Sequence, residues 1–382
     1  MAAVSDSDVI IVGAGPCGVA SALALKDLGV RSLVVDRAEA VASAWRIRYD
    51  RLRLNTARPL SHLPDRPFAK GTPMFPTRDD LVRHIDVHAK EEGLEFRFGT
   101  HVDWIDRDAG AWALRTGAGV LRAPQVIVAT GYQNDPVTPA WPGRDGFEGR
   151  MLHAAEYRNA DPFGGERVLV VGPGCSGMEI ADELARCGAA KVWLAVRTPP
   201  NMILREGPGG LPGDMLGAAL LHLPARIGDA VTRFGRKAGI GDLTEHGLPV
   251  PDEGVMSRLH RLGTSPSIVD EQVIQSIRGG AIEIVASVEA LERRTVCLAD
   301  GSRLEPDVVI CATGYRCGLE PLVGHLGVLD AKGRPRTQGE RPAAPGLRFI
   351  GYLPRPGALG YWGKQAKRAA KAISREFRSG SP

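Results

Sequence analysis

A glycine-rich loop directly after an apolar run occurs twice in this chain, and this repetition constrains the fold more than any other feature. The first loop spans residues 13–18 after the segment 8–12, which is apolar from residue 9 onward, and the second spans 172–177 after the segment 167–171, which is apolar from residue 168 onward. Continuous apolar runs of this length suit parallel strands buried on both faces. Each loop is followed by a helical pattern and another strand. The repeated pattern therefore predicts two βαβ units of the dinucleotide-binding type.

The first copy has every part of such a unit. Its helix is expected over 19–28 with Gly29 as the stop, and its second strand over 31–35, ending at Asp36. Glycines permit the tight turn and the close approach of a pyrophosphate to the helix N-terminus, and Asp36, 18 positions after Gly18, can accept a hydrogen bond from a ribose hydroxyl. A glycine turn without a ligand is the alternative. The candidate nucleotide-binding residues here are Gly13, Gly15, Gly18, Asp36 and Arg37.

The second copy differs where the nucleotide is selected. After a helix expected over 178–186 and a strand over 191–196 comes Arg197 in place of an acid, 20 positions after Gly177. A cation there suits a ribose 2′-phosphate, so the second nucleotide is expected to be NADPH. A solvated surface arginine is the alternative reading. The candidates are Gly172, Gly174, Ser176, Gly177 and Arg197.

Both copies close in the same way, with short strands forming a small meander and a last strand that ends Ala-Thr-Gly-Tyr, at 129–132 and 312–315. Thr130 and Thr313 in these ends are further cofactor-binding candidates. We expect an α/β fold of two Rossmann-like domains. The first is expected to be discontinuous, at 1–150 and 316–382, because a strand over 347–352 and a final helix follow the second copy. The second is expected at 151–315, with an insertion at about 201–281 that carries no clean motif.

Bulk composition excludes several classes of protein. With 43% hydrophobic and 24% charged residues and a net charge of +4, the 382 residues indicate a soluble globular chain without a nucleic-acid footprint. The six cysteines form no CxxC pair and have no metal-ligand spacing, so we expect reduced thiols and no metal site. The polar N-terminus and the interrupted apolar stretch 215–228 argue against a cleaved signal and a membrane span. A cytoplasmic protein is expected, with a homodimer as one alternative for its oligomeric state.

One further pattern, Phe147-x-Gly149-x₃-His153-x₃-Tyr157, resembles the signature of class B flavin monooxygenases, in the flavin-containing, N-hydroxylating and YUCCA-like branch. The resemblance implies FAD in the first domain and NADPH in the second. It also implies a flavin hydroperoxide, formed with O2, that transfers one oxygen atom to a nitrogen, sulfur or reactive carbonyl carbon of a small molecule. By the same resemblance Asn55 matches the active-site asparagine, and Trp45 matches a tryptophan near the flavin. His153 and Tyr157 are interpreted as structural.

Four alternatives stay open at this stage. A Baeyer–Villiger oxidant shares the plan, although that branch has a Trp-Pro ending where this chain has Tyr157. A flavin oxidoreductase or NADPH oxidase without oxygen insertion would use the same cofactors. A pyridine-nucleotide disulfide reductase needs a redox cysteine pair that the sequence does not show. A flavoprotein acting as a redox sensor or docking module is the alternative that is not an enzyme.

Overall fold

The computed structural model describes residues 7–108 and 110–379, so the expectation for the N-terminal residues 1–6 lies outside the described part. The chain folds into two compact units. The first unit contains the described residues up to Ile47, then Leu52–Asp135, and those from Tyr315 onward. The second unit contains Arg48–Arg51 and Pro136–Gly314. No helix in the described ranges is long and apolar enough to cross a membrane.

The first unit is built on a five-stranded parallel sheet in the order β20-β7-β1-β2-β3. Its central strand β1 is buried along its whole length, as its apolar run predicts, and Val9 lies opposite Ser32 of β2 and Gln125 of β7. The strands are β1 (Val9–Val12), β2 (Ser32–Val35), β3 (Glu95–Arg97), β7 (Gln125–Val128) and β20 (Leu347–Phe349).

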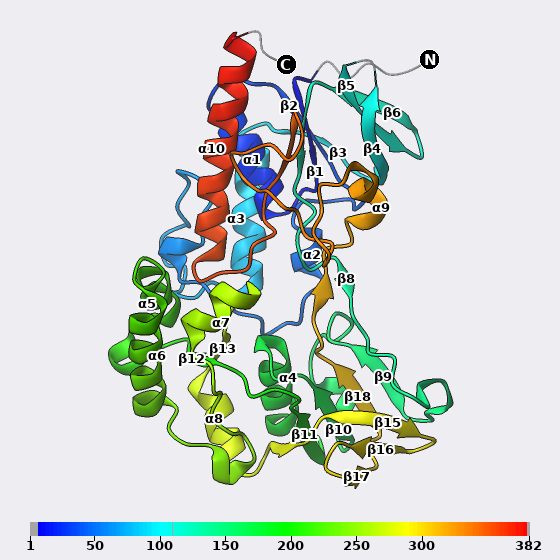
Figure 1. The fold of residues 1–382 in the computed structure, drawn as a ribbon, viewed down its shortest axis with the longest axis vertical. Coiled ribbons are helices and arrows are strands. Elements are labelled where there is room, and N and C mark those ends of the chain that lie inside the picture. The colour runs from blue at the N-terminus through cyan, green and yellow to red at the C-terminus, as the bar shows by residue number, and fades with distance from the viewer. Residues whose placement is uncertain (1–6, 109, 380–382) are drawn as a thin grey trace. The chain divides into compact units, whose positions relative to one another are not determined.

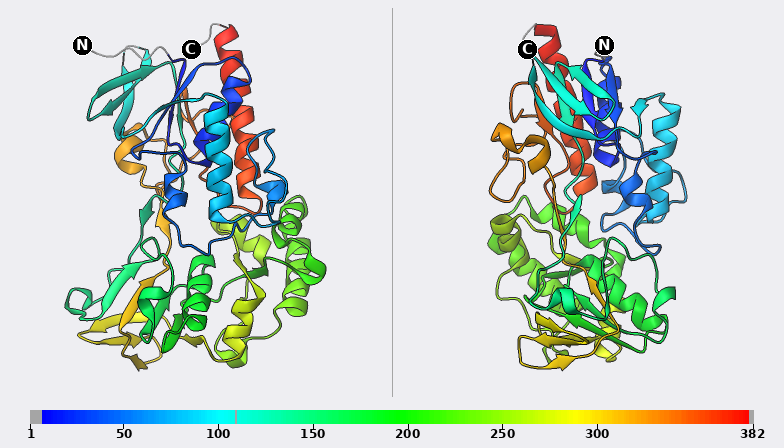
Figure 2. Two further views of the ribbon diagram at one scale, coloured as in Figure 1. Left: turned by 180° about the vertical axis from the view of Figure 1, so that it is seen from behind. Right: turned by 90° about the vertical axis from the view of Figure 1, so that its right-hand side faces the viewer.

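Alternate residues of β1 face two different cores. Val9 and Ile11 pack with apolar residues of three helices, and Ile10 and Val12 pack with a small antiparallel meander. Figures 1 and 2 show the first and the last of these helices side by side. The helices are α1 (Pro16–Lys26), α3 (Arg78–Glu91) and α10 (Ala358–Ser379), and the meander is β4 (Val102–Asp108), β5 (Ala111–Thr116) and β6 (Gly119–Ala123).

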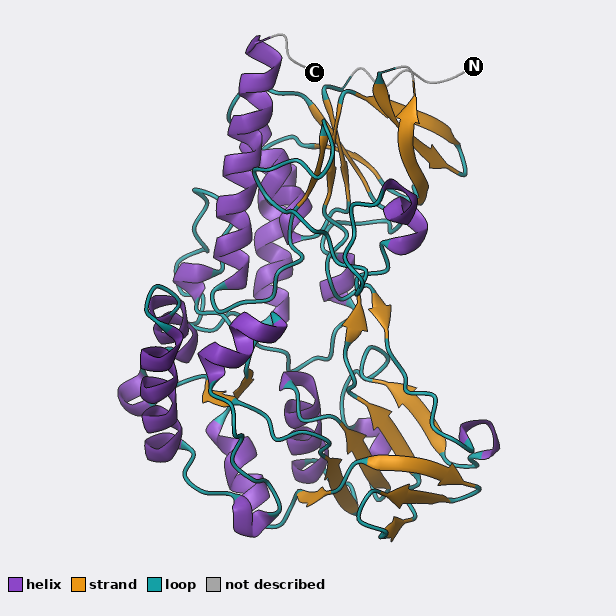
Figure 3. Ribbon diagram, in the orientation of Figure 1, coloured by secondary structure: helices purple, strands orange, loops and turns teal. Residues whose placement is uncertain are grey.

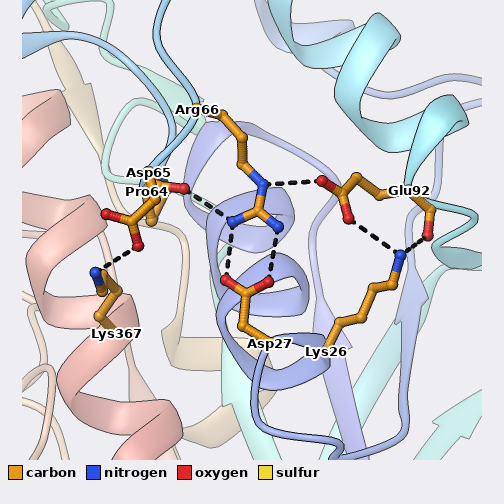
Figure 4. A network of polar contacts seen from close by, with 7 residues as sticks. All are labelled: Lys26, Asp27, Pro64, Asp65, Arg66, Glu92 and Lys367. Atoms are coloured by element: carbon orange, nitrogen blue, oxygen red, sulfur yellow. Dashed lines mark hydrogen bonds and ion pairs between the residues drawn. The ribbon is translucent and has the colours of Figure 1, made fainter.

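The segment between Ile47 and Thr77 is mostly irregular. It contains only the 3-10 turn η1 (Arg58–Leu60), after the short helix α2 (Ser43–Arg46) that carries Trp45. Arg66 fastens this segment, because its guanidinium donates to both Asp27 carboxylate oxygens at 2.7 and 2.8 Å and to Glu92 at 3.1 Å (Figure 4). Asp27 and Glu92 directly follow α1 and α3. The irregular segment is therefore held to two helix ends by charge.

The second unit repeats the strand plan of the first, with a parallel sheet in the order β14-β11-β10-β18-β9. The α/β class with parallel sheets is thus confirmed (Figure 3). The sheet strands are β9 (Arg150–His153), β10 (Arg167–Val171), β11 (Lys191–Ala195), β14 (Glu283–Val285) and β18 (Val308–Cys311). Helix α4 (Cys175–Arg186) follows β10, and the meander is β15 (Val288–Glu292), β16 (Thr295–Leu298) and β17 (Arg303–Leu304).

The expected insertion is largely helical. A two-stranded parallel ribbon, Met202 opposite Ser267, brackets most of its helices. Its elements are β12 (Met202–Leu204), α5 (Gly213–Leu220), α6 (Ala225–Gly239), α7 (Val255–Leu262), β13 (Ser267–Val269) and α8 (Glu271–Arg278). The remaining short elements are β8 (Asp135–Pro136), β19 (Tyr315–Arg316) and α9 (Glu320–Val323).

The limits of the units differ from the expected limits at three places, the smallest of which is Tyr315, since this residue belongs to the first unit. Residues 136–150 fold with the second unit, because the Leu291 amide donates to the Pro142 carbonyl and the Glu148 amide to the Arg293 carbonyl. Residues 48–51 also belong to the second unit, although they lie inside the first by sequence. Both helices after the glycine loops begin three residues earlier than expected, at Pro16 and Cys175.

Candidate functional site

The first glycine loop has the shape of a phosphate cradle. Gly13 has a φ of +108°, and an added Cβ would lie 2.7 Å from the Ala129 carbonyl oxygen. At Gly18 an added Cβ would lie 1.8 Å from the Gly13 carbonyl oxygen, so both positions require glycine. At Gly15 it would meet nothing within 4 Å. Gly15 is also the N-cap of α1, and no side chain caps the N–H groups that follow Pro16 at the start of this helix. The loop fits a dinucleotide pyrophosphate.

Asp36 is anchored at this loop. Its carboxylate accepts from the Ala14 amide at 2.6 Å and from the Ala38 amide at 2.8 Å. Its neighbour Arg37 donates to the Asn134 side chain at 3.0 Å. Asp36 therefore lies at the carboxyl end of β2, beside the loop that follows β1, where a ribose next to the pyrophosphate would lie.

Thr130 and Trp45 lie near the same loop. Thr130 follows the end of β7, and an added Cβ on Gly13 would lie 3.1 Å from its Cα. Its amide donates to the Tyr352 hydroxyl at 3.1 Å, and the two hydroxyls lie 2.8 Å apart. Tyr352 lies three residues after the end of β20, and the sequence does not predict its contact with Thr130. Trp45 is partly buried against the α1 core, and the turn before α2 is tied to the loop by the Ala42 amide, which donates to the Ala14 carbonyl at 2.9 Å.

Asn55 carries an unused acceptor. Its Oδ1 is buried, and the part of the chain that the structure describes supplies no hydrogen-bond partner for it. Its neighbours are held firmly, since the Leu54 amide donates to the Pro76 carbonyl at 2.8 Å and the Thr56 hydroxyl lies 2.6 Å from that of Ser61. A buried acceptor without a donor costs free energy of folding, so Asn55 suits a ligand that supplies a donor.

The second glycine loop repeats the geometry of the first. Gly172 has a φ of +111°, and an added Cβ would lie 2.6 Å from the Ala312 carbonyl oxygen. At Gly177 it would lie 1.9 Å from the Gly172 carbonyl oxygen, whereas at Gly174, the N-cap of α4, it would meet nothing within 4 Å. Ser176 lies in the first turn of α4. This loop also fits a pyrophosphate.

Arg197 and Thr313 lie at the ends of strands that flank this loop. Arg197 is exposed, two residues beyond the end of β11, and β11 pairs directly with β10. Thr313 follows β18 and donates its hydroxyl to the Val137 carbonyl. The loop, Arg197 and Thr313 therefore lie at the carboxyl ends of three adjacent parallel strands, where nucleotides bind in folds of this type.

The sequence does not predict a buried polar cluster that forms around Glu179 of α4. The fully buried Arg205 pairs with Glu179 of α4 and, at 2.8 Å, with Asp270. The Tyr49 hydroxyl donates to Glu179 at 2.5 Å. Burial raises the pKa of Glu179, and Arg205 opposes that rise. The cluster fixes α4 to β12, to the residue after β13, and to residues 48–51. No local pattern connects these positions.

The aromatic and histidine signature makes internal contacts of the second unit. His153 Nε2 lies 3.1 Å from the Gly314 carbonyl, and its Nδ1 lies 3.0 Å from the Ala155 amide, which donates to it. Both nitrogens are thus satisfied in the neutral tautomer, and burial lowers the pKa of His153. The Tyr157 hydroxyl donates to Glu183 at 3.1 Å, and its ring stacks on Phe163. These contacts support the structural interpretation of both residues.

Comparisons with known proteins agree on one family. A model of the pyridine nucleotide-disulphide oxidoreductase family matches residues 10–203. Indole-3-pyruvate monooxygenase YUCCA1 of Oryza sativa subsp. japonica is 35% identical over 319 residues, which cover 80% of this chain and 76% of the relative. Probable indole-3-pyruvate monooxygenase YUCCA9 of Arabidopsis thaliana is 32% identical over 336 residues, covering 86% and 79%.

Solved structures share the fold. A flavin-containing monooxygenase from Stenotrophomonas maltophilia superposes with a TM-score of 0.74 at 21% sequence identity, covering 97% of this chain and 99% of that one. At that identity the likeness concerns the arrangement of the elements.

Proposed function

The chain belongs to the pyridine nucleotide-disulphide oxidoreductase family, in its flavin monooxygenase branch, and from this premise we propose which residues hold its cofactors and what it oxygenates. Proteins of this branch are monooxygenases that use FAD and NADPH. In such a reaction NADPH supplies two electrons, one atom of O2 enters the substrate, and the other leaves as water. FAD, when bound, would supply the redox chemistry that links NADPH to O2.

We assign FAD to the first unit and NADPH to the second. The pair of loops with open positions at Gly15 and Gly174 carries this assignment, because each provides uncapped helix N–H groups for one pyrophosphate. Asp36 would hold the FAD ribose. Arg197 would pair with the 2′-phosphate of NADPH, where a carboxylate would repel it.

Asn55 is the proposed active-site residue. Its buried, unpartnered Oδ1 can accept a hydrogen bond from a ribose hydroxyl or another donor of a bound cofactor. Trp45 would border the flavin.

For the substrate we propose an aryl 2-oxo acid, which presents a reactive carbonyl carbon. The support comes from the relatives, which are indole-3-pyruvate monooxygenases at 35% and 32% identity. Insertion of one oxygen atom between the keto and carboxyl carbons, with loss of CO2, converts such an acid into a carboxylic acid one carbon shorter. Amines and thioethers are the competing substrate classes.

The family model also covers disulphide reductases, and the cysteines argue against that activity. A dithiol centre needs two neighbouring thiols, one of them with a lowered pKa. All six cysteines are free, and burial raises the pKa of Cys17 to about 12 and those of Cys311 and Cys317 to about 11. Burial raises the pKa of Cys175 as well. These thiols are poor nucleophiles.

Substrate-dependent NADPH oxidation tests the proposed function. Purified chain loaded with FAD is given NADPH and either indole-3-pyruvate, a tertiary amine or a thioether, and products are identified by mass spectrometry. We expect the 2-oxo acid to stimulate NADPH oxidation and to yield the shortened acid. Oxygenated amine or thioether without shortened acid would overturn the substrate class, and NADPH oxidation without any oxygenated product would overturn the activity. A cytoplasmic location and a homodimer stay predictions, which fractionation and analytical ultracentrifugation test.

A further inference from the structure

Helix α6 in the insertion has its apolar stripe on the outside. Leu223, in the turn before it, and Ile227, Val231 and Phe234 follow one another at spacings of 4, 4 and 3, so they share one helix face. All four are exposed, Phe234 to 75%. A helix that packs on a globular core ordinarily shows the opposite pattern.

The inner face of α6 carries its two buried residues, Gly228 and Asp229. An added Cβ on Gly228 would lie 2.6 Å from the Met256 side chain, so α6 and α7 pack closely there. Asp229 caps α7 by accepting from the Met256 amide at 2.6 Å and the Ser257 hydroxyl at 2.5 Å. The side that faces the unit is thus fixed by these contacts, and α6 cannot turn its stripe inward without breaking them.

Neighbouring residues extend the exposed stripe. Leu211 is 70% exposed, and Met215 and Leu216 of α5 are also exposed. Together with the stripe on α6 they form what we call the α5–α6 patch: Leu211, Met215, Leu216, Leu223, Ile227, Val231 and Phe234. The patch lies entirely within the second unit, and α5 and α6 are adjacent in Figure 1. Exposed apolar residues gathered on two adjacent helices are typical of an interaction surface.

The exposed charged residues within the segment 211–239 have one sign. Arg226, Arg233 and Lys237 are exposed and lie at spacings of 7 and 4, so they form a row along α6 beside the stripe. Between residues 211 and 239 the two carboxylates, Asp214 and Asp229, are both buried. The exposed surface of this segment therefore combines apolar side chains with cations alone.

We propose that the α5–α6 patch binds the surface of an anionic lipid bilayer, with α6 lying in the plane of the interface. Such helices insert their apolar face at the boundary of headgroups and acyl chains and place Lys and Arg at the headgroups. The 15 residues of α6 give it a length of about 22 Å along the surface. A second copy of the chain is a poorer occupant. An isologous interface would bring the cation row against itself, with no exposed carboxylate in the segment to neutralise it.

Vesicle sedimentation of the full FAD-loaded chain tests this proposal. Phosphatidylcholine vesicles are compared with vesicles that also contain phosphatidylglycerol. The double variant Ile227→Ser/Phe234→Ser removes the apolar stripe, and the triple variant Arg226→Gln/Arg233→Gln/Lys237→Gln removes the cations. Phe377→Ser is the matched control, because Phe377 is an exposed aromatic residue on the basic helix α10. The substituted side chains are exposed, so thermal unfolding is expected to stay at the wild-type temperature.

We expect binding to the anionic vesicles alone, weakened by salt and unchanged in Phe377→Ser. Loss of the two apolar side chains should weaken it at least about tenfold. Loss of three cations, at about fivefold each, should weaken it on the order of a hundredfold. Equal binding to neutral vesicles, no binding, or binding unaffected by either variant would overturn the proposal. A further result would also overturn it: the wild type is a dimer in analytical ultracentrifugation and does not bind vesicles, and Ile227→Ser/Phe234→Ser is a monomer. The patch would then bind a second copy of the chain.

Discussion

At the scale of single residues, Asn55 and Thr56 are adjacent but make different contacts. Oδ1 of Asn55 is buried with no partner among the described residues, whereas Thr56 hydrogen-bonds to Ser61. An unsatisfied buried acceptor costs about 1–3 kcal/mol. We therefore expect Asn55→Ala to leave the free energy of unfolding unchanged or raised, while product formed per NADPH falls about tenfold or more. Denaturant titration and product quantification measure the two quantities.

Thr56→Val is the control for that prediction. It removes a buried hydroxyl partner, so the free energy of unfolding should fall by about 1–3 kcal/mol while product per NADPH stays at the wild-type ratio. If Asn55→Ala instead lost stability and kept its product yield, Asn55 would be an ordinary turn residue.

We propose that Arg197 selects NADPH over NADH. Arg197→Ala should raise KM for NADPH about tenfold or more and leave KM for NADH nearly unchanged, because only NADPH has a 2′-phosphate to lose its partner. Steady-state kinetics with both nucleotides measure this. Arg293→Ala is a suitable control, since Arg293 is an exposed arginine of the same unit. An equal rise in KM for NADPH and for NADH would show that Arg197 does not bind the 2′-phosphate.

Some residues near the site could be predicted from the sequence and others could not. The two loops, Asp36 and Arg197 stand at fixed offsets from an apolar strand, and such offsets follow from the βαβ geometry itself. Tyr352 and Arg205 stand at no such fixed offset from a glycine loop or strand. Tyr352 meets Thr130 only because β20 returns to pair with β7, and Arg205 meets Glu179 through the insertion. Contacts set by tertiary pairing leave no local pattern.

At the scale of elements, Arg66 holds the irregular segment to the ends of α1 and α3 (Figure 4). Its side chain is 12% exposed and serves two carboxylates, so Arg66→Met should lower the free energy of unfolding by about 1–3 kcal/mol. Lys367→Met is the control. Lys367 pairs with Asp65 at an exposed position, where an ion pair contributes about 0–1 kcal/mol. Equal effects in denaturant titrations would contradict this view of the segment.

The same segment makes the protein sensitive to acid through His84 of α3. His84 is buried against Phe68 and its Nε2 accepts from the Leu63 amide at 3.2 Å, and burial lowers the pKa of His84 to about 4. The unfolded chain, with a pKa of about 6.5, then binds the proton more readily. Stability should therefore fall as pH drops from about 6.5 to about 4, by about 2 kcal/mol at pH 5.

His84→Gln isolates this effect, because glutamine keeps an acceptor for the Leu63 amide but does not titrate. Denaturant titrations at pH 7 and pH 5 should show a smaller difference for the variant than for the wild type. A difference of the same size in both proteins would assign the acid sensitivity to other groups.

The regular elements were predictable and the limits of the units were not. The apolar runs predict β1 and β10 to within a residue, and the structure shows Thr77 capping α3, with its hydroxyl accepting from the Asp80 amide at 3.1 Å. The helices after the loops start early because Gly15 and Gly174 are themselves N-caps. Residues 48–51 join the second unit because Tyr49 donates to Glu179, which lies far along the chain.

At the scale of the whole molecule, one chain carries the same parallel-sheet plan twice, and each copy has a glycine loop with one open position. In this account the two loops take different nucleotides, so that electrons pass from NADPH through FAD to O2. Such a chain should consume one NADPH for each oxygen atom placed on the substrate. A chain with only one working nucleotide site would not couple the two events.

Labelling with ¹⁸O2 tests this central claim most directly. The FAD-loaded protein is given NADPH and indole-3-pyruvate under ¹⁸O2, and both the carboxylic acid product and NADPH consumption are measured. The account predicts one ¹⁸O atom in each product molecule and one NADPH consumed for each product. Product without label, or NADPH consumed with all of the label recovered in hydrogen peroxide or water, would contradict it.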